Sequence, residues 1–500
     1  MPVVEHIIHV ANGKLAVDTP PAFVRDMAKR AAANPVVVLH CHGGLVKESS
    51  GRKTAARLYD VYQGAGAFPV FFVWEAGLFE TLGNNLGEIA QEEFFRLLWK
   101  RVVRIVSRKT SQTDGQRAAS ALPLVDTGTI ERAIDESLLR DGAGADRVDE
   151  LARSEPAVQP AAELSELEQV QLERDLQFDA ELLLEVQRIS NGLREPADIL
   201  ADEQLRGAAP VRGSSRTLMD PAAIGTLVDS PDPGARGVVS LLKVAKAVVM
   251  IAARVIARMV RHRDHGLHAT IVEEILREFY VANAGGAIWE LMKKDTADCF
   301  RNDPQVFGGT CFLEALAQDM RDQHTSPRIV LVGHSTGAVF ISHFMDAAAT
   351  RLPAATTVDI IFLAPAARFE LTASTFATHA GRIHAVRSFG MKDAVEKADR
   401  LVPVLYPHSL LYFVSGVVER GDDVPIVGMA RFHDAGHYPS VAFPEVEQVR
   451  RFLQGQSNGT VWSTVENVGV GINSMSEHHG DFDNDAVTLQ SVQDIIRAGF

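Results

Sequence analysis

Residues 328–344, RIVLVGHSTGAVFISHF, hold the most informative pattern in this chain. Arg328 to Val332 is a short, apolar and largely β-branched run of the kind that forms a buried parallel strand. Ala338 to Thr350 reads as a helix. Between them, Gly333-His334-Ser335-Thr336-Gly337 must turn sharply, and glycines are needed there because the backbone crowds itself. The stretch therefore predicts a strand-turn-helix unit that raises the Ser335 hydroxyl above a sheet.

Short apolar runs on both sides of this unit predict further strands of the same sheet. Two precede it and three follow it: Pro35–His40, Pro69–Trp74, Val358–Leu363, Ile383–Arg387 and the weaker Val461–Val465. A helical segment from Gly51 to Gly64 joins the first two as a β-α-β unit. Strands that alternate with helices are typical of the α/β class, in which helices cover both faces of a mostly parallel sheet.

The strand pattern stops between Leu78 and His324. Helices are predicted there at Gln91–Ser107, Leu164–Ile189, Val238–His262 and Thr270–Lys294, with loosely ordered, Gly-, Ser- and Ala-rich connectors at Lys109–Ala161 and Arg206–Gly237. Because strands resume immediately afterwards, we expect a core of residues 1–77 and 325–500. Residues 78–324 are expected to form a large helical cap, inserted between the early strands and the strand before Ser335.

Composition restricts the class of protein and its surroundings. Of the 500 residues, 50 are Lys or Arg and 64 are Asp or Glu, so the net charge is −14 and argues against nucleic acid as a partner. Three cysteines, Cys41, Cys299 and Cys311, make no disulfide framework and suit a reducing compartment. The first residues lack a signal-peptide pattern, and Lys and Arg interrupt the most apolar window, Val238–Val260. We expect a cytoplasmic protein in which membrane contact is possible but not favoured.

Residues Ile329 to Phe344 resemble the nucleophile elbow of α/β-hydrolases, especially serine esterases and lipases, and the resemblance covers roughly residues 34–77 and 326–500. His40-Cys41-His42-Gly43-Gly44-Leu45 is similar to the His-Gly-Gly oxyanion loop of esterases. The resemblance implies an α/β-hydrolase fold with Ser335 as nucleophile. Amides of Gly43, Gly44 and Thr336 would form the oxyanion hole. The alternative is that both segments are ordinary glycine-rich turns.

The order serine, acid, histidine in this superfamily directs the choice of the remaining catalytic residues. Asp393 lies just past the predicted strand Ile383–Arg387 and is our candidate acid, with Asp399 and Glu396 as competitors. His479 lies between the last predicted strand and a C-terminal helix, Thr488–Ala498, and is our candidate base. His437, in a Gly-His-Tyr-Pro segment, and His478 are the alternatives.

Together these residues predict a serine hydrolase that cleaves carboxylic esters through an acyl-enzyme, with a small-molecule ester carrying an apolar acyl group as substrate. Thioesters, amides and lactones use the same chemistry. A lipase or phospholipase with Val238–Val260 as a lipid-facing lid is one alternative, and a non-catalytic interaction protein on the same scaffold is another. We expect no cofactor and no metal, because the Asp481–Asp485 run lacks the glycine of a calcium loop and the His433/His437 pair lacks the glutamate of a zinc motif. The sequence predicts no oligomeric state.

Overall fold

The strands form one eight-stranded sheet in the computed structural model, which describes residues 2–44, 48–74, 79–114, 162–192, 217–229, 238–281, 285–403, 405–419 and 421–500. The order across the sheet is β10-β9-β8-β7-β3-β4-β1-β2, and all neighbours are parallel except β1 and β2. The strands are β1 (Ile7–Ala11), β2 (Lys14–Leu15), β3 (Val36–Cys41), β4 (Phe68–Trp74), β7 (Arg328–His334), β8 (Val358–Leu363), β9 (Ile383–Met391) and β10 (Thr460–Ser463). The predicted α/β class with a mostly parallel sheet is confirmed.

The central strands are apolar on both faces because both faces are covered. In β7, Ile329 and Leu331 point into one apolar core, and Val330 and Val332 point into the other. This alternation follows from the two-residue period of a strand. It explains why the run Arg328–Val332 is continuously apolar, as buried parallel strands usually are.

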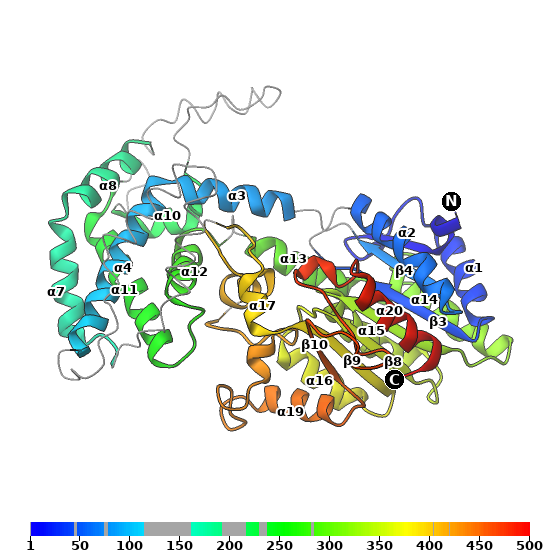
Figure 1. Ribbon diagram of the computed structural model, residues 1–500. Coiled ribbons are helices and arrows are strands. Elements are labelled where there is room, and N and C mark those ends of the chain that lie inside the picture. The colour runs from blue at the N-terminus through cyan, green and yellow to red at the C-terminus, as the bar shows by residue number, and fades with distance from the viewer. Residues whose placement is uncertain are drawn as a thin grey trace.

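Helices form a layer on each face of the sheet (Figure 1). One face is covered by α1 (Pro21–Ala32), α14 (Gly308–Asp322), α15 (Gly337–Arg351), α16 (Phe369–His379) and α19 (Pro444–Gln454). The other is covered by α2 (Glu48–Gly64) and α20 (Ala486–Ala498), which pack side by side although they lie at opposite ends of the chain. Short helices complete the fold: η1 (Pro2–His6), α17 (Asp393–Ala398), α18 (Leu410–Phe413), η2 (Val414–Val418), η3 (Ala430–His433) and η4 (His479–Asp481).

A helical lobe occupies much of the chain between β4 and β7 and extends to the left of the sheet in Figure 1. It consists of α3 (Phe79–Gln91), α4 (Glu93–Asp114), α7 (Glu166–Gln177), α8 (Ala180–Gly192), α10 (Pro221–Leu227), α11 (Leu241–Val260), α12 (Leu267–Phe279) and a small β5/β6 pair (Val228–Asp229 and Val238–Val239). α11 lies at its centre and packs against α4, α7 and α12. α13 (Gly286–Asp298) leads from the lobe back to the sheet and contacts α15.

The structure refines the predicted helices of this region. Leu164–Ile189 is divided between α7 and α8, and Thr270–Lys294 between α12 and α13. α14 lies within the range predicted as the cap but packs against α1 and α15 on the sheet. Of the two predicted connectors, residues 115–161, 206–216 and 230–237 lie outside the described residues. The prediction of loose order is wrong for Lys109–Asp114, which belong to α4, and for 221–229, which form α10 and β5.

No helix in the described part of the chain is both long enough and apolar enough to cross a membrane. The apolar helix α11 instead carries an arginine, Arg258, that is buried in the lobe. Its guanidinium binds Glu273 at 2.7 Å and Glu274 at 3.0 Å, both on α12. The pairing with these two glutamates explains why a charged residue, Arg258, occurs in the otherwise apolar helix α11, since buried charges need partners.

Candidate functional site

Ser335 occupies a strained turn between β7 and α15. Its φ is +55°, a left-handed backbone conformation that is rare and costly for a residue with a side chain. The backbone of Ser335 makes three hydrogen bonds: its N–H donates to Leu363 O at 2.9 Å, and its carbonyl accepts from Ala366 N–H at 3.0 Å and from Ala338 N–H at 3.1 Å. A methyl group at Gly337 would overlap the carbonyl of Cys41. The turn thus needs glycine at Gly337 for close approach.

Gly43 and Gly44 follow β3, the strand beside β7, and lie at the same edge of the sheet as Ser335. A methyl group added to Gly43 would lie 3.2 Å from Ser335 Cβ, and one added to Gly44 would overlap Thr336 Oγ1. β3 and β7 are neighbours in the sheet. The strand that follows β3 in the chain, β4, lies on one side of this pair, and the strand that follows β7, β8, lies on the other, so the strand order reverses between β3 and β7. Ligands of open α/β sheets bind at the carboxyl ends of the strands at such a reversal. The structure therefore brings Ser335, Thr336, Gly43 and Gly44 together there.

A histidine loop, residues 477–483, lies beside this turn. The ring of His479 stacks on the ring of His334 with centroids 5.3 Å apart, and His334 directly precedes Ser335. His479 is buried, yet neither of its ring nitrogens has a hydrogen-bond partner among the described residues. The nearby Thr336 Oγ1 is also buried without a partner. Buried polar atoms without partners are uncommon and mark places where a polar ligand or water binds.

His334, Asp483 and Arg57 form a charged group next to the serine. Asp483 lies 3.3 Å from Nδ1 of His334 and 2.9 Å from the guanidinium of Arg57. Burial alone would lower the pKa of His334, but the Asp483 carboxylate outweighs it and the pKa is raised above 6.5. Burial would raise the pKa of Asp483, but His334 lowers it to about 2.

Three other histidines near the site are buried and neutral at pH 7. Burial lowers the pKa of His479 and of His40 to about 3, and that of His42 to about 4. His42 Nε2 accepts a hydrogen bond from Trp74 N–H at 3.1 Å, which only an unprotonated nitrogen can do. A neutral imidazole is the form that can accept a proton from a serine hydroxyl.

Asp393 is not brought to the histidine loop. It begins α17, where it binds Lys397 at 2.7 Å and accepts a hydrogen bond from Tyr412 at 2.5 Å. Asp399, one of its competitors, contacts the loop instead. One carboxylate oxygen accepts the His479 amide at 2.8 Å and the other lies 2.9 Å from Nδ1 of His478. Asp399 is thus the carboxylate that holds the loop, and the role of Asp393 as the acid stays a prediction.

The remaining candidates lie in different surroundings. Glu396 is fully buried beside Ser409, and burial raises its pKa to about 8, so it is a neutral acid at pH 7. His437 is exposed and pairs with Asp434 at 3.0 Å on the surface. His478 is exposed as well, and its bond to Asp399 raises its pKa. Of the three candidate histidines, His479 alone is buried.

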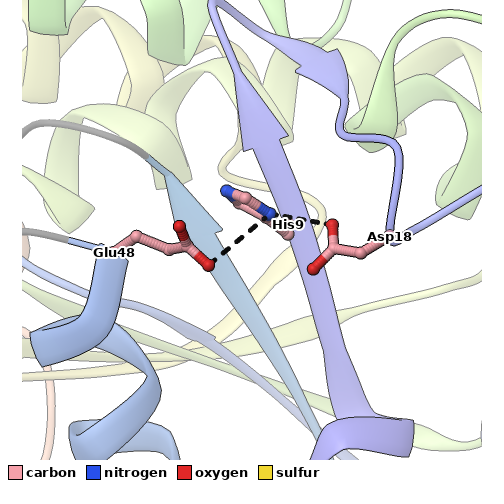
Figure 2. A group of neighbouring side chains, drawn as sticks. All are labelled: His9, Asp18 and Glu48. Atoms are coloured by element: carbon pink, nitrogen blue, oxygen red, sulfur yellow. Dashed lines mark hydrogen bonds and ion pairs between the residues drawn. The ribbon is translucent and has the colours of Figure 1, made fainter.

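A second polar cluster lies near the end of β1. His9, Asp18 and Glu48 form the only group of potential metal ligands found in the described part of the chain, with ligand atoms within 4.8 Å of one another. Figure 2 shows His9 between the two carboxylates, with its Nδ1 2.9 Å from Asp18 and 3.9 Å from Glu48. The guanidinium of Arg52 binds both carboxylates as well, at 2.5 and 2.6 Å. Because one arginine and one histidine bind both carboxylates, we interpret the cluster as a polar network that ties β1 to α2.

Comparison of the chain with protein-family models, with curated proteins and with solved structures found no match. What the site can do is therefore argued from its geometry. Sequence reasoning pointed to the Ser335 turn, to the glycine loop after β3 that contains Gly43 and Gly44, and to the histidine loop. It did not single out His334 and Asp483, which lie far apart in the chain and have no local motif beyond the position of His334 next to Ser335.

Proposed function

We propose that this chain is a serine hydrolase of the α/β-hydrolase type that cleaves carboxylic esters through an acyl-enzyme. The left-handed Ser335 at the point where the sheet order reverses is the observation that carries the proposal. A non-glycine residue costs about 1–3 kcal/mol in such a conformation and keeps it only when the surroundings enforce it. Such strain concentrates at functional sites, and a serine on a sharp strand-to-helix turn is what a nucleophile elbow requires.

In the proposed reaction, the Ser335 hydroxyl attacks the ester carbonyl while His479 accepts its proton. The resulting oxyanion is bound by amides of Gly43 or Gly44 and of Thr336, which begins helix α15 and so adds the positive end of that helix dipole. The same histidine then protonates the leaving alcohol and activates the water that cleaves the acyl-enzyme. Asp399 supports this by fixing the backbone of His479.

An apolar acyl group suits the surroundings of the glycine loop. Met292, on α13, is buried against this loop, where a methyl group at Gly44 would overlap its sulfur. A methionine adapts readily to apolar ligands of different shape. The lipid-facing lid is less well supported, because α11 buries residues such as Val248 and Ile251 inside the lobe.

Hydrolysis of p-nitrophenyl esters of increasing acyl length, by the wild type and by Ser335→Ala, tests this function. We expect that kcat/KM rises with chain length, and that Ser335→Ala lowers kcat by about three or more orders of magnitude without lowering the melting temperature. Ser342→Ala is the matched control, since Ser342 is a buried serine on the helix that follows the turn, α15, and its hydroxyl donates to Ala338 O. A Ser335→Ala variant as active as the wild type would contradict the proposal and favour a non-catalytic role.

A further inference from the structure

The residue before the nucleophile, His334, connects two separate parts of the site. Its side chain is buried, and its Nε2 lies 3.0 Å from the carbonyl oxygen of His479. Its Nδ1 lies 3.3 Å from the Asp483 carboxylate. The nucleophile turn and the histidine loop are thus joined through one imidazole.

The two partners of His334 determine its protonation. A carbonyl oxygen can only accept a hydrogen bond, so Nε2 must carry a proton. The Asp483 carboxylate is ionised and also accepts only, so Nδ1 must carry one too. His334 is therefore an imidazolium, in contrast to its neutral neighbours His40 and His479.

The charges around His334 fit this state. Asp483 and His479 face it from the histidine loop, Arg57 from α2, and His40 and His42 from the end of β3. Asp483 is the one carboxylate among them and also binds Arg57, which holds the carboxylate in place. Loss of the His334 proton would end the ion pair with Asp483 and leave one N–H, so that only one of the two acceptors, the His479 carbonyl or the Asp483 carboxylate, could still be bound.

We propose that His334 is a positioning residue for the Ser335 reaction: held as an imidazolium by Asp483, it donates to the His479 carbonyl and keeps the histidine loop over the nucleophile turn. The inference rests on the proposed hydrolase function. It predicts that turnover declines in alkaline solution, because His334 loses its proton there while the base, His479, remains neutral and competent.

The test measures p-nitrophenyl acetate hydrolysis from pH 5 to 9.5 in the wild type, His334→Gln and Asp483→Asn, with folding checked by cooperative melting. We expect an alkaline decline of kcat in the wild type that shifts to lower pH in Asp483→Asn. In His334→Gln, kcat should fall about 100-fold with little change in KM, because the base is displaced, and the decline should vanish. His384→Gln is the matched control, because His384 is also held by a carboxylate, Asp359 at 2.8 Å, but is exposed on β9.

Histidine ring signals in the carbon-13 NMR spectrum provide a readout that does not depend on catalysis. One signal, absent from His334→Gln, should titrate above pH 6.5 in the wild type and at lower pH in Asp483→Asn. If the wild type hydrolyses the ester but His334→Gln keeps its alkaline decline, or if the His334 signal titrates below pH 6.5, the positioning role is overturned. A wild type that neither hydrolyses the ester nor reacts at Ser335 contradicts the hydrolase function itself, and the positioning role with it.

Discussion

At the residue level, three acidic residues follow β9, namely Asp393, Glu396 and Asp399, and of these Asp399 binds the histidine loop. Ser335 could be found because the strained turn demands glycines close by in the sequence, and these stand at Gly333 and Gly337. The pairing of Asp399 with the histidine loop could not be found, because the two residues it contacts lie about 80 positions away. Several acidic residues follow β9, and only their three-dimensional placement separates them.

The choice of base is tested by replacing the three candidate histidines with alanine. His479→Ala should lower kcat by several orders of magnitude, because a nucleophile and its base act as a unit. His478→Ala should cost much less, since Asp399 would still accept the amide of residue 479. His437→Ala should be nearly silent, since its ring pairs with Asp434 on the surface.

Steady-state kinetics of these variants decide between the candidates. If His478→Ala is inactive while His479→Ala remains active, the base is His478, paired with Asp399. If His437→Ala is inactive, the histidine loop is not part of the site.

At the scale of elements, strands that consist of a long apolar run were predicted well, whereas short strands and breaks between helices were predicted poorly. The central strands β3, β4, β7 and β8 stand within one or two residues of their predicted bounds, because strands buried on both faces leave an unmistakable apolar run. β1 was missed because it has only five residues and His9 interrupts its apolar run. The division between α12 and α13 was missed because the apolar pattern continues in the second helix, although Gly285 adopts a left-handed conformation at its start.

A buried ionic network joins α12 of the helical lobe to the chain that follows β9. His265 lies between two fully buried carboxylates, with Nδ1 2.6 Å from Glu273 and Nε2 2.8 Å from Asp423. Burial alone would raise the pKa of Asp423, but Arg431 and His265 lower it. Arg431 in turn contacts Tyr412, the residue that binds Asp393. The network therefore extends to Asp393 through the Tyr412 hydroxyl.

Replacing the central histidine of this network should destabilise the protein. His265→Phe leaves Glu273 and Asp423 without the group between them, and breaking a buried pair costs about 3–5 kcal/mol. Urea denaturation at pH 7 measures this free energy of unfolding. His437→Phe is the control, because it removes a single exposed pair and should cost less than about 1 kcal/mol. Equal losses in the two variants would mean that the network does not stabilise the fold.

At the scale of the whole molecule, buried neutral histidines make the fold sensitive to acid. Burial lowers the pKa of five histidines to between about 3 and about 4: His40, His42, His268, His433 and His479. In the unfolded chain they titrate near 6.5, so between pH 6.5 and 4 the unfolded state binds more protons. Stability therefore falls as the pH falls through this range, and each histidine contributes up to about 1.4 kcal/mol per pH unit.

Urea denaturation at pH 7, 6 and 5 tests this expectation, with His433→Gln as the informative variant. Its glutamine amide can replace the bond from His433 to Val427 O but cannot titrate. The stability of His433→Gln should fall less steeply with pH than that of the wild type. Parallel pH dependences in the two proteins would show that His433 does not contribute to acid sensitivity.

At the scale of the whole molecule, fluorophosphonate labelling followed by peptide mapping identifies the serine that the fold makes reactive. A fluorophosphonate bonds covalently to a serine hydroxyl that an adjacent base activates. From the proposed hydrolase function we expect a single adduct, on Ser335, formed quickly in the folded wild type, slowly in His479→Ala and not at all after unfolding. An adduct on another serine, or a folded wild type in which Ser335 stays unlabelled, would contradict it.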